Sequence, residues 1–291
     1  MSGRGDFKLD GNTKITFSPK IWIPKQIEEA WKLKQELGQE AIFIAGGTWI
    51  QLRWESGEKL PNHIIHLGKI DALNKVQLSA DQTLSIGTFT TLAACRSRPD
   101  IQKYWPILAE AARNVASPAV RNQGTIGGNI ACGFGDIIPA LLVLGATITW
   151  FDGSDYITDE AGNFLKNSSA KIVTEIHLPK SPKTKTFYKK IGRREAFTPS
   201  LLTVAGTLAM NERNKIEYVR LAVGGGVIVP SRLLTCESML QNQVPNEELW
   251  QKAHAQILQE FQPLTDRFAS SHYLKLVAAN LLIAGLTESL S

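Results

Sequence analysis

The sequence predicts an α+β protein with two domains: a larger ligand-binding region that ends near residue 180, then a smaller domain of sheet and helices. Three observations predict this. Short apolar strand-like runs alternate with helix-like runs as far as residue 180. A polar, proline-containing joint, "SPKTK", occupies residues 181–185. Beyond the joint, three strand-like runs precede three helix-like runs, which is the order of an α+β domain.

The first elements show clear local signals. Pro24 and Gly38 bracket a run with one apolar stripe, which indicates an amphipathic helix with both end signals. "AIFIA" at 41–45 is a short, continuously apolar strand, expected to be buried on both faces. "GGTWIQLRWESG" at 46–57 indicates a glycine turn feeding a short helix. The pattern at 75–86, around Asp81, predicts a hairpin.

The remaining elements follow from the same periodicities. We expect helices at 90–97, 100–117 and 137–146 and a strand at 147–151. After the joint we expect strands at 186–192, 201–210 and 215–225, then helices at 230–241, 246–261 and 270–286.

Composition excludes several classes of function. The 291 residues are 43% apolar and can bury a large core, and the net charge of +5 is spread along the chain, which argues against nucleic-acid binding. The longest nearly apolar run has 14 residues and contains Pro139, so it is too short to span a bilayer. Residues 1–16 lack the apolar core of a signal peptide and are expected to form a flexible polar tail.

The chain also offers little chemistry of its own. Its three cysteines are far apart and, without an export signal, favour reduced thiols in the cytoplasm. An iron–sulfur cluster normally takes four cysteine ligands, so this chain cannot hold one alone. His63 and His66 lie three apart on a predicted strand and therefore point to opposite faces, so we expect no metal site. No GxSxG or HExxH motif and no catalytic nucleophile–base pair is present.

The first candidate site is the loop "FIAGGTWI" at 43–50. A buried strand ends at Gly46 and Gly47, and Thr48 opens a helix. Free backbone N–H groups and the positive end of the helix dipole would suit a phosphate or pyrophosphate. An ordinary strand-to-helix turn is the alternative for this loop taken alone.

The second candidate is "RNQGTIGGNIACGFGD" at 121–136, with five glycines. It contains neither the GxGxxG dinucleotide turn nor the GxxxxGK[ST] triphosphate loop. Thr125 and Asn129 could donate hydrogen bonds to phosphate or sugar, and the acceptor Asp136 suits a ribose or ribityl hydroxyl. Arg121 could pair with phosphate or be a solvated surface residue. Two such loops favour one extended ligand with a pyrophosphate at its centre.

Six motifs in order now identify a resemblance: "AGGT", "SIGTFTTLAA", "RNQGTIGGNIA", "PALLVLGA", "TEIHLP" and "FYKKIGRREAF". Over residues 17–286 the chain resembles the FAD-binding (medium) subunit of the molybdenum hydroxylases, such as xanthine dehydrogenase and carbon monoxide dehydrogenase. "AWKLKQELG" and "AGGTW" favour the bacterial xanthine dehydrogenase type of purine catabolism. The resemblance implies a two-subdomain FAD-binding domain of the PCMH (vanillyl-alcohol oxidase-like) type at 17–180. It implies a CO dehydrogenase flavoprotein C-terminal domain at 186–290.

The resemblance also implies cofactor-binding residues. One group would wrap one side of the FAD pyrophosphate: Ile44, Ala45, Gly46, Gly47, Thr48, Trp49 and Ile50. A second group would hold the other side: Thr125, Gly127, Gly128 and Asn129. Asp136 would hydrogen-bond the sugar-like portion, Thr174 would offer a backbone contact, and Lys189 would lie near FAD and favour reduced, anionic flavin. Lys190 would then point to the opposite face of its strand.

The chain departs from the family pattern in its second loop. The usual Ala-Ser-Pro run before the acid is shortened to "CGFG", so we expect the loop to lie differently over the ligand. Trp49 replaces an acidic or polar residue and would stack near the ring system or pack in place.

The resemblance implies an electron-transfer role in a complex. A molybdenum–pterin centre on a large subunit would oxidise the substrate, and two [2Fe–2S] clusters on a small subunit would pass electrons to FAD. NAD or another acceptor would then receive them. Two alternatives remain: a stand-alone FAD oxidoreductase, or an assembly subunit that has lost FAD, which the shortened loop would support.

Overall fold

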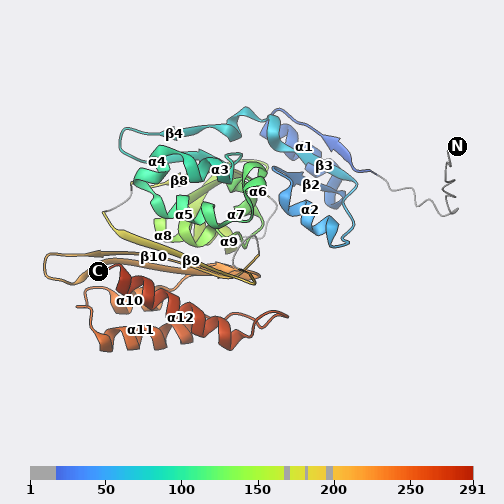
Figure 1. The fold of residues 1–291 in the computed structure, drawn as a ribbon. Helices are drawn as coiled ribbons and strands as arrows, with labels where there is room; N and C mark the ends of the chain where they lie inside the picture. Colours follow the sequence, from blue (N-terminus) through green and yellow to red (C-terminus); the bar gives the residue numbers. More distant parts are fainter. Residues whose placement is uncertain (1–17, 167–170, 181–182, 195–198, 291) are drawn as a thin grey trace, which may run out of the picture.

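A computed structural model describes residues 18–166, 171–180, 183–194 and 199–290. The tail expected at 1–16 lies outside these residues. The described chain is arranged in layers, with a small parallel sheet and a helix-rich middle above a long antiparallel sheet and a final helical layer (Figure 1). The α+β class predicted from the sequence is confirmed.

The N-terminal subdomain is a three-stranded parallel sheet in the order β1-β3-β2. Its strands are β1 (Lys20–Trp22), β2 (Ala41–Ile44) and β3 (His63–His66), and its helices are α1 (Ile27–Leu37) and α2 (Thr48–Glu55). Short 3₁₀ turns follow at Gly38–Glu40, Leu67–Lys69 and Asp71–Asn74. The expected burial of β2 on both faces is wrong: only Ala41 is buried, because this small sheet has its core against α1.

The second subdomain is built on a five-stranded antiparallel sheet in the order β4-β5-β8-β6-β7. Its strands are β4 (Val76–Leu78), β5 (Leu84–Gly87), β6 (Thr147–Phe151), β7 (Tyr156–Glu160) and β8 (Ile172–Leu178). The hairpin predicted around Asp81 is confirmed as β4–β5. Helices pack against this sheet around a core that includes Trp105 and Leu141.

Those helices are α3 (Leu92–Ser97), α4 (Pro99–Tyr104), α5 (Pro106–Asn114), α6 (Pro118–Gln123), α7 (Ile126–Ala131), α8 (Ile138–Leu144) and α9 (Ala161–Lys166). The single helix expected at 100–117 is wrong, since the structure has two helices there. Pro106 has no N–H to donate, and the residue before a proline avoids the helical region, so Trp105 breaks the run. The "WP" dipeptide carried this signal.

The C-terminal unit is an antiparallel sheet in the order β12-β11-β10-β9, with one face packed on helices. Its strands are β9 (Lys185–Gly192), β10 (Ser200–Met210), β11 (Ile216–Gly225) and β12 (Ile228–Arg232). Its helices are α10 (Leu234–Leu240), α11 (Glu247–Glu260) and α12 (Ser271–Glu288). The three predicted strands are confirmed. The helix expected from residue 230 begins only at Leu234, because Ala222 and Val223 pair with residues 231–232 and hold them in β12.

The two faces of this sheet serve different neighbours. Phe187 faces α12, where the ring packs against Gly285, whereas Tyr188 joins the core of the second subdomain. Ala205 and Ala222 join the same core. The C-terminal unit therefore shares a hydrophobic core with the region that carries the second glycine loop, and α8 lies against its strands (Figure 1).

Candidate cofactor-binding site

The first glycine loop joins β2 to α2 and is shaped by two glycines. Gly47 has φ +73°, the left-handed region that favours glycine, and forms the N-cap of α2. Gly46 is a close-approach position, because a Cβ atom there would lie 1.8 Å from the carbonyl oxygen of Gln123. Ile44 ends β2, and its side chain packs beneath Gly47. The chain thus turns from strand to helix as the sequence predicted.

The start of α2 leaves backbone donors free. Within the described residues, no hydrogen bond reaches the N–H groups of Thr48, Trp49 and Ile50, and no side chain caps the helix. The first N–H groups of a helix have no partner inside the helix, and they carry its positive dipole end. These three donors are suited to a phosphate or pyrophosphate.

In the second loop, the protein satisfies its own donors. Thr125 caps α7 by accepting a hydrogen bond from the Gly128 N–H at 3.0 Å. The N–H groups of Ile126 and Gly127 donate to the carbonyls of Thr90 and Thr88 at 2.9 Å each. The Asn129 N–H bonds to the Thr125 carbonyl, and the Asn129 side-chain oxygen accepts from the Ile137 N–H at 3.3 Å. The backbone N–H groups of this loop are therefore used to fix its own conformation, and the loop forms a wall of defined shape.

The two glycine loops lie against each other, an arrangement that would suit one extended ligand. Gly46 contacts Gln123 and Gly124 so closely that a side chain has no room. A Cβ atom on Gly124 would lie 3.4 Å from the Thr48 hydroxyl oxygen. The contact is made by Gly46 and Thr48 of the first loop with Gln123 and Gly124 of the second.

Two departures from the family pattern touch each other. Trp49, at the start of α2, and Phe134, in the shortened "CGFG" segment, form an edge-to-face aromatic pair with ring centroids 5.3 Å apart. Trp49 is 47% exposed. The pair bridges the two loops at the protein surface, so the shortened loop is accompanied by an aromatic contact that links it to the first loop.

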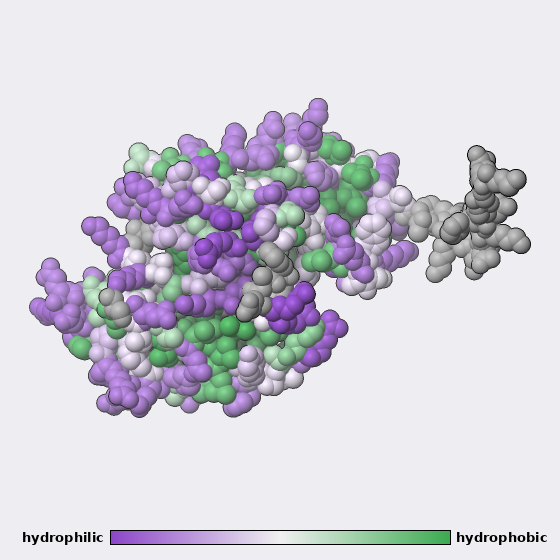
Figure 2. Space-filling model, viewed as in Figure 1, coloured by the Kyte–Doolittle hydropathy of each residue, from purple (hydrophilic) through white to green (hydrophobic). Residues whose placement is uncertain are grey.

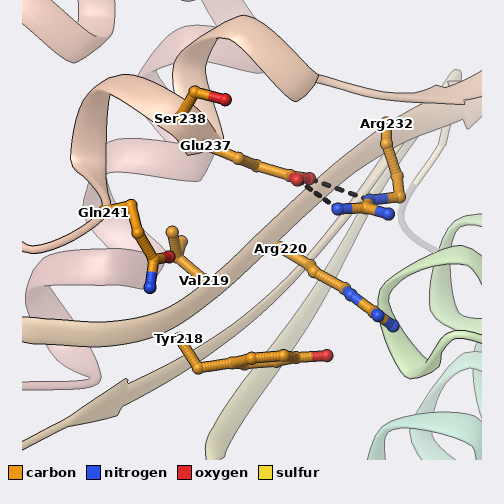
Figure 3. Close-up of a pocket in the computed structure, with 7 residues that line it drawn as sticks. All are labelled: Tyr218, Val219, Arg220, Arg232, Glu237, Ser238 and Gln241. Atoms are coloured by element: carbon orange, nitrogen blue, oxygen red, sulfur yellow. Dashed lines mark hydrogen bonds and ion pairs between the residues drawn. The ribbon is translucent and has the colours of Figure 1, made fainter.

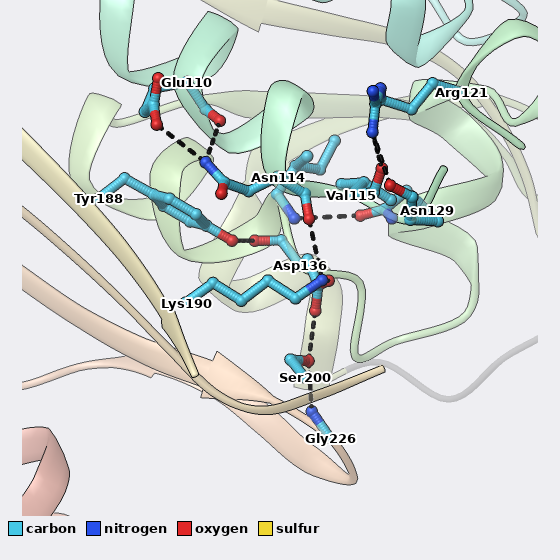
Figure 4. A network of polar contacts seen from close by, with 12 residues as sticks. Glu110, Asn114, Val115, Arg121, Asn129, Asp136, Tyr188, Lys190, Ser200 and Gly226 are labelled. Carbon is cyan, nitrogen blue, oxygen red and sulfur yellow. Dashed lines mark hydrogen bonds and ion pairs between the residues drawn. The ribbon is translucent and has the colours of Figure 1, made fainter. Parts of the chain in front are cut away.

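Each carboxylate oxygen of Asp136 has a partner on the C-terminal unit (Figure 4). Its Oδ2 atom lies 2.8 Å from the Lys190 ammonium, and its Oδ1 atom accepts a hydrogen bond from the Ser200 hydroxyl at 2.5 Å. Its backbone carbonyl accepts from the Tyr188 hydroxyl at 2.9 Å. Burial, together with the charge of Asp136, raises the pKa of Tyr188 well above its ordinary value, so this hydroxyl stays a donor.

Thr174 and Lys189 each have protein partners of their own. Thr174 is buried in β8, where its hydroxyl donates to the Thr149 carbonyl at 3.1 Å and its carbonyl accepts from the Thr88 N–H. Lys189 points to the face of β9 that meets α12, with its ammonium 3.4 Å from Glu288. The neighbouring Lys190 is on the Asp136 side, so the predicted opposition of the two lysines is confirmed.

Sequence reasoning missed the role of Arg121. Its side chain is buried, and its Nη1 atom donates to the carbonyls of Val115 at 2.7 Å and Ala116 at 2.6 Å. The expected solvated surface position is therefore wrong, and a phosphate partner stays a prediction. The guanidinium holds the turn before α6, in which Ala116 has a positive φ of +40°. Positive φ in a residue with a side chain is unfavourable and needs such support.

Two cavities lie outside the loop contact. One, of about 500 Å³, is lined by Ile50, Trp54 and charged residues behind α2. The other, of about 260 Å³, lies beside α10, where Arg232 and Glu237 form an ion pair beside Tyr218 and Arg220 (Figure 3). The Glu237 carboxylate also accepts from the Leu221 N–H, so the pair is part of the packing of α10 on β11.

Neither metal nor membrane chemistry is evident in the described part of the chain. It contains no group of three or more His, Cys, Asp or Glu side chains arranged to hold a metal ion. His63 and His66 have separate partners, the Trp22 indole and the Gly68 N–H. Among the same residues, no helix combines the length and apolar character that a bilayer span requires.

Comparison with known protein families decides the ligand class. Residues 14–181 match the FAD-binding domain in molybdopterin dehydrogenase. The chain belongs to this family. Residues 186–289 match a second family, the CO dehydrogenase flavoprotein C-terminal domain. The chain is therefore an FAD-binding medium subunit of the molybdenum hydroxylase type, as the resemblance implied.

Individual relatives extend over most of the chain. The glyceraldehyde dehydrogenase medium chain of Sulfolobus acidocaldarius is 29% identical over 78% of this chain and 83% of its own. A putative xanthine dehydrogenase FAD-binding subunit of Escherichia coli is 26% identical over 80% and 83%. The carbon monoxide dehydrogenase structure of Hydrogenophaga pseudoflava superimposes with a TM-score of 0.86 at 25% identity, covering 94% of this chain and 97% of that chain.

The residues present fit the cofactor of this family. The free N–H groups at the start of α2 match a pyrophosphate, and glycine at position 46 keeps the contact between the loops free of side chains. The second loop adjoins the first through Gln123 and Gly124. Contact of Asp136, Thr174 and Lys189 with FAD stays a prediction. In the structure, each of these side chains interacts with the protein groups described above.

Proposed function

We propose that this chain is the FAD-binding electron-transfer subunit of a molybdenum hydroxylase complex of the xanthine dehydrogenase type. In this complex a large molybdenum–pterin subunit oxidises the substrate, and a small subunit carries the [2Fe–2S] clusters. NAD is the proposed acceptor, with another acceptor as the alternative. The proposal rests on one observation above all: two glycine loops in contact, one presenting three N–H donors to which no described residue bonds.

Each part of the site has a physical role in this proposal. Bound FAD supplies reversible electron transfer, which the chain lacks on its own. Thr48, Trp49 and Ile50 bind the pyrophosphate through their N–H groups. Gly46 lets the two loops approach each other closely, and the Asn129 side chain, which accepts from the Ile137 N–H, helps to fix the second loop.

The partners and the purine substrate are supported by similarity. Relatives of this chain carry the names medium chain, medium subunit and FAD-binding subunit, which are parts of larger assemblies. The segments "AWKLKQELG" and "AGGTW" favour the xanthine dehydrogenase type. Other relatives act on carbon monoxide, nicotine or glyceraldehyde, so the substrate is tested on the assembled complex.

The first experiment is the visible spectrum of the purified chain. We expect a yellow protein with two flavin bands, or a colourless protein that becomes yellow when FAD is added. It should not hydroxylate xanthine by itself. A chain that refuses FAD at millimolar concentration would favour the assembly-subunit alternative, and purine turnover by the chain alone would favour a stand-alone enzyme.

The second experiment uses the complex. An affinity tag on this chain should co-purify a molybdenum subunit and a [2Fe–2S] subunit from the native source. The complex is then supplied with xanthine, carbon monoxide or an aldehyde, and reduction of NAD is followed at 340 nm. Faster turnover of an aldehyde than of xanthine would reject the purine proposal and leave the relay role intact.

We also propose a cytoplasmic location. All three cysteines are free, and burial raises the pKa of Cys95 and of Cys236 to about 12. Proteins whose cysteines are unpaired are typical of a reducing compartment. Cell fractionation with antibodies against the chain tests the location, and recovery in an exported fraction would contradict it.

A further inference from the structure

The contacts of Asp136 carry an inference about how the second loop is held. Both carboxylate oxygens have partners on the C-terminal sheet: the Lys190 ammonium on β9 and the Ser200 hydroxyl at the start of β10. The Lys190 side chain is only 10% exposed and that of Asp136 only 14%. An ionised carboxylate accepts hydrogen bonds and donates none, and here each of its oxygen atoms already has one protein partner.

The partners of Asp136 are themselves fixed. The Lys190 ammonium also donates to the Asn114 carbonyl at the end of α5, at 2.9 Å. The Ser200 hydroxyl, which donates to Asp136, accepts a hydrogen bond from the Gly226 N–H at 2.9 Å. The cluster therefore joins α5, the second loop, β9, β10 and the turn after β11 (Figure 4).

Asp136 lies at the end of the shortened loop and limits its freedom. The next residue, Ile137, donates its N–H to the Asn129 side-chain oxygen, and Gly135 is pressed against the same side chain. Phe134, two residues before Asp136, packs on Trp49. Whatever fixes Asp136 also fixes the amide of Asn129 and the aromatic contact with the first loop.

We propose that Asp136, Lys190 and Ser200 form a latch between the two units, which holds the second glycine loop in its FAD-binding position before FAD arrives. Asp136 is then a positioning residue, and its carboxylate is not a cofactor ligand. This inference rests on the proposed function for its readout of FAD affinity. The latch itself is a property of the protein without cofactor.

Physical reasoning favours positioning over raw stability. Two charges withdrawn from water lose hydration that their attraction only partly restores, so a buried ion pair contributes mainly to geometry when its contacts are complete. Each charge of this pair has a further hydrogen-bond partner besides its opposite. A preorganised loop binds its ligand more tightly because the ordering cost has already been met in folding.

The first test uses the protein without FAD. Hydrogen exchange of peptides covering residues 129–137 is followed by mass spectrometry in the wild type, in Lys190→Met and in Ser200→Ala. We expect faster exchange in both variants in this segment and unchanged exchange in α11. Equal protection of 129–137 in all three proteins would overturn the latch, whether or not the chain binds FAD.

The second test measures FAD affinity through quenching of flavin fluorescence. The variants are Asp136→Asn, Lys190→Met and the double substitution, which removes both charges and leaves none unpaired. We expect each single variant to raise the Kd about tenfold, within the usual range of coupling between sites. Because the latch is already open, the double variant should bind no more weakly than either single one.

A direct cofactor contact by Asp136 predicts another pattern. Asp136→Asn would then weaken FAD binding by the same factor with Lys190 present or replaced, and Lys190→Met alone would leave the Kd unchanged. That pattern would overturn the proposal. Lys185→Met, an exposed lysine on the same strand, is the matched control and should match the wild type in both experiments. A wild type that binds no FAD would contradict the proposed function, and exchange would still decide the latch.

Discussion

In the first glycine loop, the N–H groups of Thr48, Trp49 and Ile50 have no hydrogen-bond partner among the described residues, whereas in the second loop every N–H from Ile126 to Asn129 is bonded. Their surroundings differ in the same direction. Helix α2 contains no buried residue, while α7 buries Ile126, Gly127 and Ile130. Apolar side chains also reach the surface over the N-terminal subdomain, where Leu52 and Trp54 of α2 are exposed (Figure 2).

This difference shows how two similar sequence patterns divide one task. The first loop keeps donors free and is weakly fixed by packing, so ligand binding can supply its missing interactions. In the second loop, the N–H groups donate to other groups of the protein, and these hydrogen bonds fix the shape of the loop. Substitutions in the first loop and in the second should therefore affect FAD binding and stability differently. The largest effect is expected for Gly46.

Gly46→Ala should remove the contact on which both loops depend. The new Cβ atom would lie 1.8 Å from the Gln123 carbonyl oxygen, so the backbone must separate. We expect loss of measurable FAD binding and a fall of about 1–3 kcal/mol in the free energy of unfolding, typical of overpacking. Flavin fluorescence titration and urea unfolding measure the two effects.

Gly162→Ala is the matched control for this substitution. A Cβ atom there meets only the Leu142 side chain, at an ordinary 3.7 Å. Because alanine suits a helix better than glycine, stability should rise by up to about 1 kcal/mol. Normal FAD binding by Gly46→Ala would show that the loops need no direct contact.

Arg121→Met should damage the second loop alone. The substitution leaves the carbonyls of Val115 and Ala116 without their charged donor, and we expect a loss of about 2–3 kcal/mol in unfolding free energy. Arg113→Met, at an exposed arginine on α5, should change stability by less than about 0.5 kcal/mol. Equal unfolding curves for the two variants would contradict a supporting role for Arg121.

The two glycine loops could be predicted from the sequence, but not all of the residues that contact them could be. Glycines at 46 and 47 and the pattern "TIGG" show where backbone can approach a ligand, because these signals are local. Strand alternation predicted that Lys189 and Lys190 point to opposite faces, yet not which face meets Asp136. That choice depends on how β9 pairs with β10 and on what each sheet face covers, which no local pattern contains.

Burial limited the sequence analysis in the same way. Arginine is a residue type usually found at the surface. Arg121 is buried because its guanidinium donates to two carbonyls in the turn that precedes it in the chain. The incomplete burial of β2 follows from a sheet with few neighbours on one side. In each case tertiary contacts decided what residue type alone left open.

The aromatic contact between the loops should couple them weakly. In a double-mutant cycle of Trp49→Ala and Phe134→Ala, we expect a coupling of about 1 kcal/mol in unfolding free energy, typical of an edge-to-face pair. Trp49→Phe should retain most of it because the ring edge remains. A coupling of zero would show that this aromatic pair does not link the loops.

The smallest expected effect is in the reactivity of Cys132, which depends on the conformation of the second loop alone. Its Sγ atom contacts the Asn129 carbonyl, and burial raises the pKa of its thiol above the ordinary value. The neutral thiol is therefore favoured at pH 8, and alkylation by iodoacetamide should be slower than that of a free cysteine and should accelerate as pH rises. Cys132→Ser identifies the signal, and labelling at the rate of a free thiol would show an open loop.

Strand β9 places consecutive lysines on opposite layers, one against α12 and one against the second loop. This alternation has a consequence for recombination between relatives. When a C-terminal unit is exchanged, the lysine must be kept, and it must also stay at a position of β9 whose side chain points toward the second loop. A single inserted residue before Lys190 would present the wrong side chain to the loop, so viable chimaeras should tolerate length changes of two residues better than one.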